Sequence, residues 1–531
     1  MKEKTTQSAA PLLYAILSGV MLTASFPSGK LDWMAWFALV PLLKAIELAS
    51  PLRAFKLGFV TGFAHALTLI YWVVVTLQHY GGLNIYISLG ILLLFCAYLS
   101  LYPAFFAAIL SKTRRPRFTV LLMAATWVAL EFARAKFLTG FPWCLLGYSQ
   151  YRNLGLIQIA DLFGVYGVSF LIILVNGLVY NLLFRPSALK MRAFLWESAI
   201  ILVLAGFTLY YGHFRLQEKA PRERPGRPIR VAVVQGNIDQ SIKWNPKYQG
   251  KTMEVYGRLT RTAITSKAQL IVWPETAIPF FFQDHPKLAR KVFDMIRGAD
   301  VDLIFGSPAF KSEKGRIRYY NRAYHLSSKG MVAGYYNKVH LVPFGEFVPL
   351  KKYLPFIQRL VVAAGDFASG EKVEPIRTPE LSAGVLICFE VIFPELARTH
   401  TREGAEILFN LTNDAWFGRT SAPYQHLSMA VFRAVENRRP LVRSANTGIS
   451  AFIGPKGKIL MQGDLFQEEV LVMDVTPVRA SAGFYTEQGD LFALLLSIIC
   501  LINIFHALCY HHRARRKTAK SKSSGPKPKG G

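Results

Sequence analysis

Long apolar segments, interrupted by short polar loops, fill the N-terminal part of this chain and return once near its end. They cover residues 9–26, 33–49, 57–78, 85–110, 118–137, 163–184, 194–213 and 491–510. A helix needs roughly 20 apolar residues to cross the hydrocarbon core of a bilayer, so we interpret each segment as a transmembrane helix. Segment 33–49 fits least well, because it carries Lys44 and Glu47 near its end. The pattern predicts a membrane domain of seven helices over residues 1–213 and an eighth helix within 486–510.

The region between the seventh and eighth apolar segments has a different pattern. Short apolar runs alternate there with stretches that have helical spacing. The runs predict buried strands, at residues 230–234, 270–273, 303–305, 385–388 and 407–411. The other stretches predict helices, at residues 247–266, 286–298 and 423–438. Alternating strands and helices indicate an α/β domain over 230–485, joined to the seventh span by a linker at 214–229.

Basic residues are unevenly distributed and predict an orientation in the membrane. The chain has 531 residues and a net charge of +29. Loops on the side of the N-terminus are rich in Lys and Arg, at residues 53–56, 112–117 and 185–192. The opposite loops at 28–32 and 78–82 contain a single such residue, Lys30. By the positive-inside rule the N-terminus is cytoplasmic, and seven crossings place the α/β domain outside.

The end of the chain is a basic tail. Residues 511–531 contain eight Lys or Arg and no Asp or Glu. A basic cluster beside a membrane span favours contact with anionic lipid, and nucleic acid is the less favoured partner. We therefore expect a cytoplasmic tail that binds no nucleic acid.

Cys388 is the only thiol of the α/β region, because the other four cysteines lie in or beside the long apolar segments. It ends the apolar run 381–388, which predicts a position at the end of a buried strand. A thiol there is either an inert core residue or a nucleophile that the fold supplies with a base and a cation.

Glu275 and Lys338 are the candidates for that base and that cation. Glu275 follows the predicted strand 270–273, and Lys338 follows the stretch 334–337. Because strand ends converge on one edge of a layered α/β domain, both groups could meet the thiol there. A lysine and a carboxylate beside Cys388 are expected to raise its thiolate fraction. Each residue alone also has an ordinary structural interpretation, as a helix-start residue, a surface charge and a core residue respectively.

Three motifs in this order give the residues a more specific meaning. They are Trp-Pro-Glu-Thr at 273–276, Tyr-Asn-Lys-Val-His-Leu-Val-Pro-Phe-Gly-Glu at 336–346 and Ile-Cys-Phe-Glu at 387–390. The set resembles the Glu-Lys-Cys triad of the nitrilase superfamily. With seven apolar segments before it and one after, the chain resembles the apolipoprotein N-acyltransferase family of Gram-negative bacteria, the membrane-bound branch of that superfamily. Further matches lie at 140–150, at 234–238 with Trp244 after it, and at 411–418.

The resemblance implies a fold and a reaction. The fold is a polytopic helical membrane domain joined to an αββα sandwich that lies in the periplasm. The reaction moves an acyl chain from a glycerophospholipid, which we expect to be phosphatidylethanolamine, to the α-amino group of the diacylglyceryl cysteine of an apolipoprotein. It passes through a cysteine thioester in a ping-pong sequence and needs no cofactor. We expect a monomeric, multi-pass protein of the bacterial inner membrane.

The resemblance also implies roles for the three motif residues. Glu275 accepts the thiol proton and Cys388 attacks the acyl ester. Lys338, with the backbone N–H of Phe389, stabilises the oxyanion. Phe389 departs from the superfamily, which often has tyrosine after the nucleophile, so no hydroxyl is available there.

Further residues are expected to support the reaction. Glu346 resembles an additional glutamate that orients Lys338 or the incoming amine, and Glu390 is a second supporting carboxylate. We expect four residues to bind substrate, namely Trp244, Phe344, Phe356 and Leu360. The last three belong to segment 343–370, which mixes apolar and basic residues as an interfacial lid does, or as a packed loop does.

Two membrane residues and two other functions are left open by the pattern. Glu131 and Arg134 are three residues apart and are expected to pair with each other, or to bind a lipid head group. The histidines show no metal-binding spacing, so we expect no metal. A membrane-tethered amidase acting on a small soluble substrate would share the triad, although seven spans exceed what a tether needs. A transporter or sensor would need no Glu-Lys-Cys set.

Overall fold

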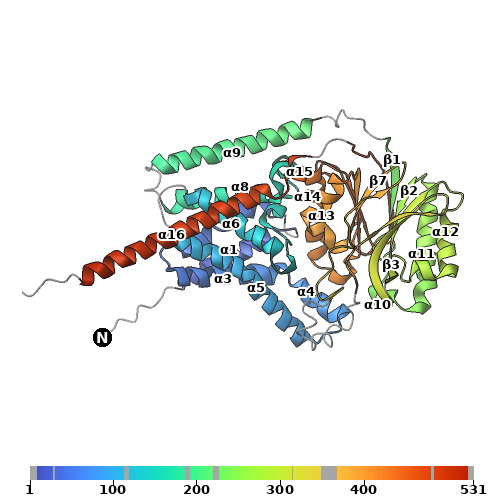
Figure 1. The fold of residues 1–531 in the computed structure, drawn as a ribbon, viewed down its shortest axis with the longest axis horizontal. Coiled ribbons are helices and arrows are strands. Elements are labelled where there is room, and N and C mark those ends of the chain that lie inside the picture. The colour runs from blue at the N-terminus through green and yellow to red at the C-terminus, as the bar shows by residue number, and fades with distance from the viewer. Residues whose placement is uncertain are drawn as a thin grey trace, which may run out of the picture.

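A computed structural model describes residues 9–27, 30–112, 119–185, 192–218, 227–313, 315–347, 367–479 and 483–523. For 510–523 only the backbone is described. The chain forms a bundle of helices at one end of the molecule and two β-sheets with flanking helices at the other (Figure 1). This arrangement agrees with the predicted division into a helical domain and an α/β domain.

The helical domain contains most of the predicted apolar helices. Its long helices are α1 (Ala10–Ala24), α3 (Pro51–Leu69), α5 (Ile85–Lys112), α6 (Thr119–Lys136), α8 (Ala160–Phe184), α9 (Arg192–Gln217) and α16 (Leu491–Ser523). Among the described residues, α5, α8, α9 and the 491–509 part of α16 are long and apolar enough to span a bilayer. A fifth span is formed if α3 is joined to residues 72–80, which continue it after a bend of 48°. The prediction of eight transmembrane helices is therefore confirmed only in part.

Segment 33–49 does not form the continuous helix that its hydropathy predicts. A 3-10 turn, η1 (Asp32–Trp36), is followed by α2 (Val40–Ala45), whose six residues extend only about 9 Å. The side chain of Asn176 in α8 accepts a hydrogen bond from Leu39 N and donates one to Ala35 O. A buried amide from another helix thus replaces the hydrogen bonds that a continuous helix would make, and the prediction for this segment is wrong.

Segment 57–78 is also interrupted, and a side chain of the other domain contacts the break. Helix α3 ends at Leu69, and α4 (Trp72–Val75) and the π-helical turn η2 (Thr76–Tyr80) follow. Gln425 donates from Nε2 to Leu69 O at 3.0 Å, and its Oε1 accepts from the indole N–H of Trp72 at 3.2 Å. The carbonyl at the end of α3 is therefore paired with the α/β domain.

The α/β domain contains two six-stranded sheets. The first has the order β12-β1-β2-β3-β4-β5 and the second β11-β10-β9-β8-β7-β6. The strands are β1 (Ile229–Gln235), β2 (Leu270–Val272), β3 (Asp302–Glu313), β4 (Arg316–Leu326), β5 (Val332–Asn337), β6 (Ile376–Arg377), β7 (Ser382–Ile387), β8 (Ile407–Thr412), β9 (Leu441–Ala445), β10 (Ala451–Ile453), β11 (Ile459–Gln462) and β12 (Glu469–Val475). All five predicted strands are present, and β3 is longer than predicted because it pairs with β4 in a long antiparallel hairpin.

Helices cover the outer faces of both sheets, and the three predicted helices are present. Helices α11 (Pro246–Thr265) and α12 (Pro286–Ile296) pack on the first sheet, and a core of mainly aliphatic side chains fills the space between the sheets. Helices α13 (Pro394–Arg402) and α14 (Ala422–Asn437) cover the second sheet. Figure 1 shows α13 and α14 between that sheet and the helical domain. These layers confirm the predicted αββα sandwich. One of its helical layers, formed by α13 and α14, packs against the membrane domain.

Candidate active site

Cys388 lies where β7 turns into a short 3-10 helix, η8 (Cys388–Ile392). Its φ is 51°, a left-handed conformation that costs energy for any residue other than glycine and is common at functional sites. The side chain is buried. The turn therefore holds a strained, buried thiol at the end of a strand, as the sequence pattern predicted.

Glu390 ties this turn to the segment that carries Lys338. One of its carboxylate oxygens accepts from Ile387 N at 2.7 Å. The other accepts from Val339 N at 2.7 Å, from His340 N at 3.1 Å and from the Tyr336 hydroxyl at 3.0 Å. Complete burial raises the pKa of Glu390 to about 7, although its backbone donors act in the opposite direction. Glu390 therefore positions the nucleophile and the lysine segment relative to each other.

Lys338 lies just past the end of β5 in a buried cluster of carboxylates. Its Nζ lies 2.9 Å from Glu346 Oε2 and 3.6 Å from Glu275 Oε1. Asn321 of β4 donates from Nδ2 to both Glu275 Oε1 and Glu346 Oε1, at 2.8 Å each. Burial disfavours the ammonium form, but the charges of Glu346 and Glu275 outweigh it and raise the pKa of Lys338. The lysine is held charged between two carboxylates.

The pKa of the Cys388 thiol differs from the predicted direction. Burial and the nearby negative charge of Glu275 raise the pKa of Cys388 above its usual value, and the charge of Lys338 only partly offsets them. Lys338 thus lowers the pKa of the thiol as predicted, but burial and Glu275 outweigh it, so the predicted net lowering is not found. The physical reason is desolvation, which sequence position cannot reveal.

Residues 230–483 match the family described as carbon-nitrogen hydrolase, and residues 18–178 match the family described as apolipoprotein N-acyltransferase N-terminal domain. The apolipoprotein N-acyltransferase of Geobacter metallireducens is 46% identical over 484 residues, which cover 91% of this chain and 92% of that protein. The chain belongs to the apolipoprotein N-acyltransferase family.

A second relative has the same name and a similar coverage. The apolipoprotein N-acyltransferase of Methylococcus capsulatus is 34% identical over 490 residues, covering 90% of this chain and 92% of that protein. Among solved structures, a carbon-nitrogen hydrolase from Helicobacter pylori G27 has a TM-score of 0.36 at 21% identity, covering 49% of this chain and 91% of that chain.

The expected substrate-binding residues of this acyltransferase divide into two groups. Trp244 is half exposed and lines a cavity of about 530 Å³ together with Phe281, Tyr319 and Phe367. Phe344 is half exposed but does not line this cavity. Phe356 and Leu360, with residues 348–366 of the predicted lid, lie outside the described residues.

Phe389 packs through its ring where the superfamily often has a hydroxyl. It makes an edge contact with Phe393, with 5.2 Å between ring centroids, and lies 6.0 Å from the ring of His340. The side chain therefore contributes apolar packing beside the nucleophile. Any direct role in chemistry falls to its backbone N–H.

The matched segments 140–150 and 411–418 contact each other near Cys388. Asp414 forms an ion pair with Arg443 at 2.6 Å and contacts the ring of His426 at 3.0 Å. The ring of His426 stacks on Trp143 of the membrane domain, with 5.5 Å between ring centroids. Asn410 donates to Leu386 O in the strand that carries Cys388. The membrane domain thus packs, through Trp143, against the residues next to Cys388.

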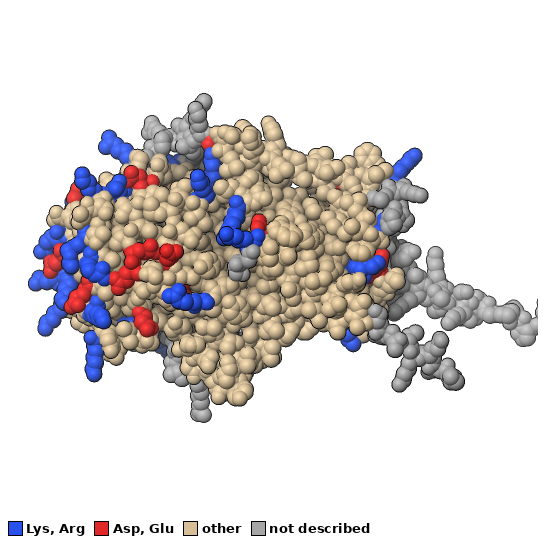
Figure 2. Space-filling view, turned by 180° about the vertical axis from the view of Figure 1, so that it is seen from behind, with Lys and Arg blue, Asp and Glu red and all other residues tan. Residues whose placement is uncertain are grey.

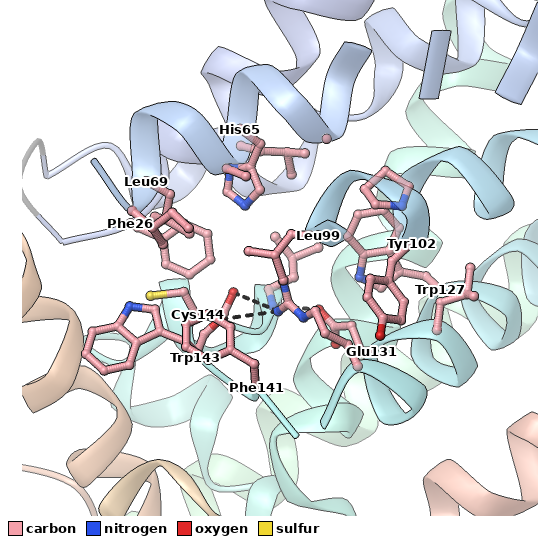
Figure 3. Close-up of a pocket in the computed structure, with 18 residues that line it drawn as sticks. Phe26, His65, Leu69, Leu99, Tyr102, Trp127, Glu131, Phe141, Trp143 and Cys144 are labelled. Atoms are coloured by element: carbon pink, nitrogen blue, oxygen red, sulfur yellow. Dashed lines mark hydrogen bonds between the residues drawn. The ribbon is translucent and has the colours of Figure 1, made fainter. Parts of the chain in front are cut away.

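Glu131 and Arg134 do not form the expected direct ion pair among the residues that the structure describes. Glu131 instead accepts from Leu146 N at 2.7 Å. Arg134 donates from Nη2 to the carbonyl oxygens of Trp143 and Cys144, at 3.3 and 3.4 Å. Both side chains line an internal cavity of about 50 Å³ in the membrane domain. Figure 3 shows Glu131, Trp143 and Cys144 around the same cavity. Glu131 and Arg134 hold the 143–146 segment in place, and the predicted pairing is wrong.

Two buried residues of the site carried no signal in the sequence. Asn321 lies within a strand whose neighbours are polar and aromatic, so its burial could not be anticipated. Lys243 precedes Trp244 and is only 1% exposed, yet a lysine in a short helix is normally at the surface. Its Nζ lies beside the Glu275 turn.

Proposed function

We propose that Cys388 is the nucleophile of a two-stage acyl transfer, with Glu275 as general base and Lys338 as the cation that stabilises the oxyanion. The observation that carries the proposal is the buried cluster in which Lys338 Nζ contacts Glu275 and Glu346 and acts, with Glu275, on the pKa of the thiol. A strained thiol, a carboxylate and a fixed ammonium are the groups that nucleophilic acyl transfer requires.

In the first stage the thiol attacks the ester carbonyl of a glycerophospholipid. Glu275 takes the proton of Cys388 as the C–S bond forms, and the ammonium of Lys338 with the Phe389 N–H receives the negative oxygen of the tetrahedral intermediate. Collapse breaks the C–O bond. The departing alkoxide takes the proton from Glu275, and a lysophospholipid leaves behind a thioester on Cys388.

In the second stage the α-amino group of a diacylglyceryl cysteine attacks that thioester. Glu275 accepts the proton that the amine loses, and Lys338 again stabilises the oxyanion. Breaking the C–S bond yields an amide and returns a proton to the sulfur of Cys388. The covalent stage divides one difficult transfer into two easier ones.

The supporting carboxylates act on these groups indirectly. Glu346 shares Asn321 and Lys338 with Glu275, so it fixes the ammonium and balances its charge. Glu390 holds the nucleophile turn against the 338–340 segment. Neither needs to touch the substrate to affect the rate.

The surface of the helical domain supports substrates that are anchored in lipid. Figure 2 shows a broad surface over the helical domain with few charged side chains, whereas Lys, Arg, Asp and Glu gather over the sheet domain. Apolar side chains of the helices point outward, including Leu94 at 74% and Val203 at 70% exposure. An apolar band of this kind suits the hydrocarbon core of a bilayer. We place this multi-pass protein in the bacterial inner membrane, with the α/β domain in the periplasm.

The cavity that Trp244, Phe281, Tyr319 and Phe367 line suits an acyl chain. Trp244 on its wall follows Lys243, and Phe281 belongs to the segment that continues from Glu275. We propose that this cavity binds apolar parts of the substrates and that the donor is phosphatidylethanolamine. The protein needs no second copy for this chemistry, so we propose a monomer. The lid function of 343–370 stays a prediction.

The test is a trapping experiment with the purified full chain. A phospholipid labelled in its acyl chain should leave the label on Cys388, and a diacylated lipopeptide added afterwards should remove it as an N-acyl product. Absence of label on Cys388 under conditions that support turnover would exclude the thioester. The match of residues 18–178 to the acyltransferase N-terminal domain favours this function over a tethered amidase. Release of the label to water alone would favour the amidase.

A further inference from the structure

Lys243 is a buried lysine beside the proposed general base, and none of the steps described so far uses it. It ends the short helix α10 (Gln240–Lys243) and is 1% exposed. Its Nζ donates to the Thr276 hydroxyl at 2.8 Å and to the carbonyl oxygen of Glu275 at 3.3 Å. Both acceptors belong to the turn that carries the Glu275 carboxylate.

That turn is strained and closely confined. Thr276 has a φ of 45°, a left-handed conformation that is unusual for a β-branched residue. On the opposite side, Gly306 of β3 approaches so closely that an added Cβ would lie 2.4 Å from Thr276 N. The turn therefore lies between a strand that allows no side chain and a lysine that holds its hydroxyl and carbonyl groups.

The charge of Lys243 also affects the reacting groups. The ionisable groups that act on it are Glu275, at the end of β2, and Cys388, at the end of β7. Lys338 already lies between the carboxylates of Glu275 and Glu346. A protonated Lys243 provides a second positive charge, so that two ammonium groups balance two carboxylates before the thiol loses its proton.

We propose that Lys243 is a positioning residue for the general base. Its ammonium group holds the strained Glu275–Thr276 turn, and its positive charge stabilises negative charge on Glu275 and Cys388 during attack. This inference rests on the proposed role of Glu275 and Cys388 and adds a fourth ionisable residue to their site.

The protonation of Lys243 makes its role measurable. Burial lowers the pKa of Lys243 to about 8, although the charges of Glu275 and Cys388 act against this shift. Below that pH the residue carries its charge, and above it the amine is neutral. A neutral amine still has two N–H groups for the two acceptors of the turn. Raising the pH therefore removes the charge and leaves the hydrogen bonds.

The experiment measures single-turnover acylation of Cys388 by labelled phospholipid between pH 6.5 and 9.5. Lys243→Met keeps the length of the side chain and removes both the charge and the donors. We expect it to slow acylation roughly 10- to 100-fold at pH 7, the scale of a misplaced catalytic group. The ratio of the wild-type rate to the Lys243→Met rate should fall as the pH rises through about 8.

Two further variants separate charge, hydrogen bond and folding. Thr276→Val removes the nearer acceptor but leaves the charge of Lys243, so it should slow acylation by only a few-fold at every pH. Lys247→Met makes the same change at an exposed lysine of α11 and should behave as wild type. A wild-type acylation rate in Lys243→Met would overturn the proposal. A wild-type to Lys243→Met rate ratio that stays constant with pH would also overturn the proposal, because it would indicate that the charge of Lys243 has no effect on acylation.

A second measurement does not depend on the phospholipid reaction. In a variant whose other four cysteines are replaced by alanine, iodoacetamide reports the reactivity of Cys388 directly. Lys243→Met should slow this alkylation several-fold near pH 7.5, and Lys247→Met should not. If phospholipid leaves no acyl group on the wild-type enzyme, the proposed function fails. The alkylation result then still decides whether Lys243 acts on the thiol.

Discussion

Gly306 provides a direct test of how accurately the Glu275 turn must be placed. The turn packs against the backbone of β3 without an intervening side chain. Gly306 N donates to Pro274 O at 3.2 Å, and Ile278 N donates to Gly306 O at 3.1 Å, so hydrogen bonds attach the turn to the strand on both sides of Glu275. An alanine at 306 would place its Cβ 2.4 Å from Thr276 N and 2.7 Å from the Cα of Glu275.

The size of the effect follows from these distances. Ordinary contact with a Cβ begins near 3.4 Å, so the turn must move by about 1 Å to accept the methyl group. Backbone atoms cannot rotate away as a flexible side chain can. A displacement of about 1 Å at a reacting group costs roughly 100-fold in rate. Overpacking of this kind also lowers the free energy of unfolding by about 1–3 kcal/mol.

The assay is the single-turnover acylation of Cys388, combined with the melting temperature of the purified protein. Gly306→Ala should acylate roughly 100-fold more slowly while still binding phospholipid. Gly250→Ala is the matched control, because its added Cβ in α11 would meet no atom within 4 Å outside its chain neighbours and the backbone of its own helix. The control should retain full activity, and a helix favours alanine over glycine by about 1 kcal/mol. An unimpaired acylation rate in Gly306→Ala would refute the argument that this strand positions Glu275.

Three other predictions concern the nucleophile, the charged pair and the orientation. Cys388→Ala should abolish acyl-enzyme formation, whereas replacing the other four cysteines by alanine should leave turnover largely intact; normal turnover by Cys388→Ala would disprove the assignment. Glu275→Gln and Lys338→Met should each lose roughly 100-fold or more in acylation rate with lipid binding retained, as measured by single turnover and co-purified lipid. In intact spheroplasts, a membrane-impermeant thiol reagent should label Lys247→Cys but not Ser523→Cys, and the opposite pattern would reverse the proposed topology.

Much of the architecture could be predicted because buried strands and helices have characteristic spacings of apolar residues in the sequence. The strands around 230–234 and 407–411 are buried on both faces and appear as continuous apolar runs, and the α14 helix shows its apolar spacing. Cys388, Glu275 and Lys338 were identifiable because each lies just past a strand end, at one edge of the sandwich. Local hydropathy and position relative to a strand are properties that a sequence contains.

Hydropathy failed where a partner from elsewhere in the chain replaces a local hydrogen bond. Segment 33–49 has the apolar content of a helix, but Asn176 satisfies its backbone groups and lets it break. Helix α3 ends at Leu69, where Gln425, far along the chain, satisfies its terminal carbonyl. An unpaired backbone group inside a membrane is costly, so such breaks depend on contacts that only the folded chain supplies.

The chemistry of the site was decided by tertiary structure in the same way. The sequence determined which groups are present, and its resemblance to a family predicted that a thiol, a carboxylate and a lysine act together. Folding decided that Asn321 links the two carboxylates, that Glu390 joins two segments through four donors, and that Lys243 is buried at the Glu275 turn. Burial in the folded chain also raises the pKa of the Cys388 thiol. Desolvation and charge proximity depend on three-dimensional distance, and no pattern along the chain measures that quantity.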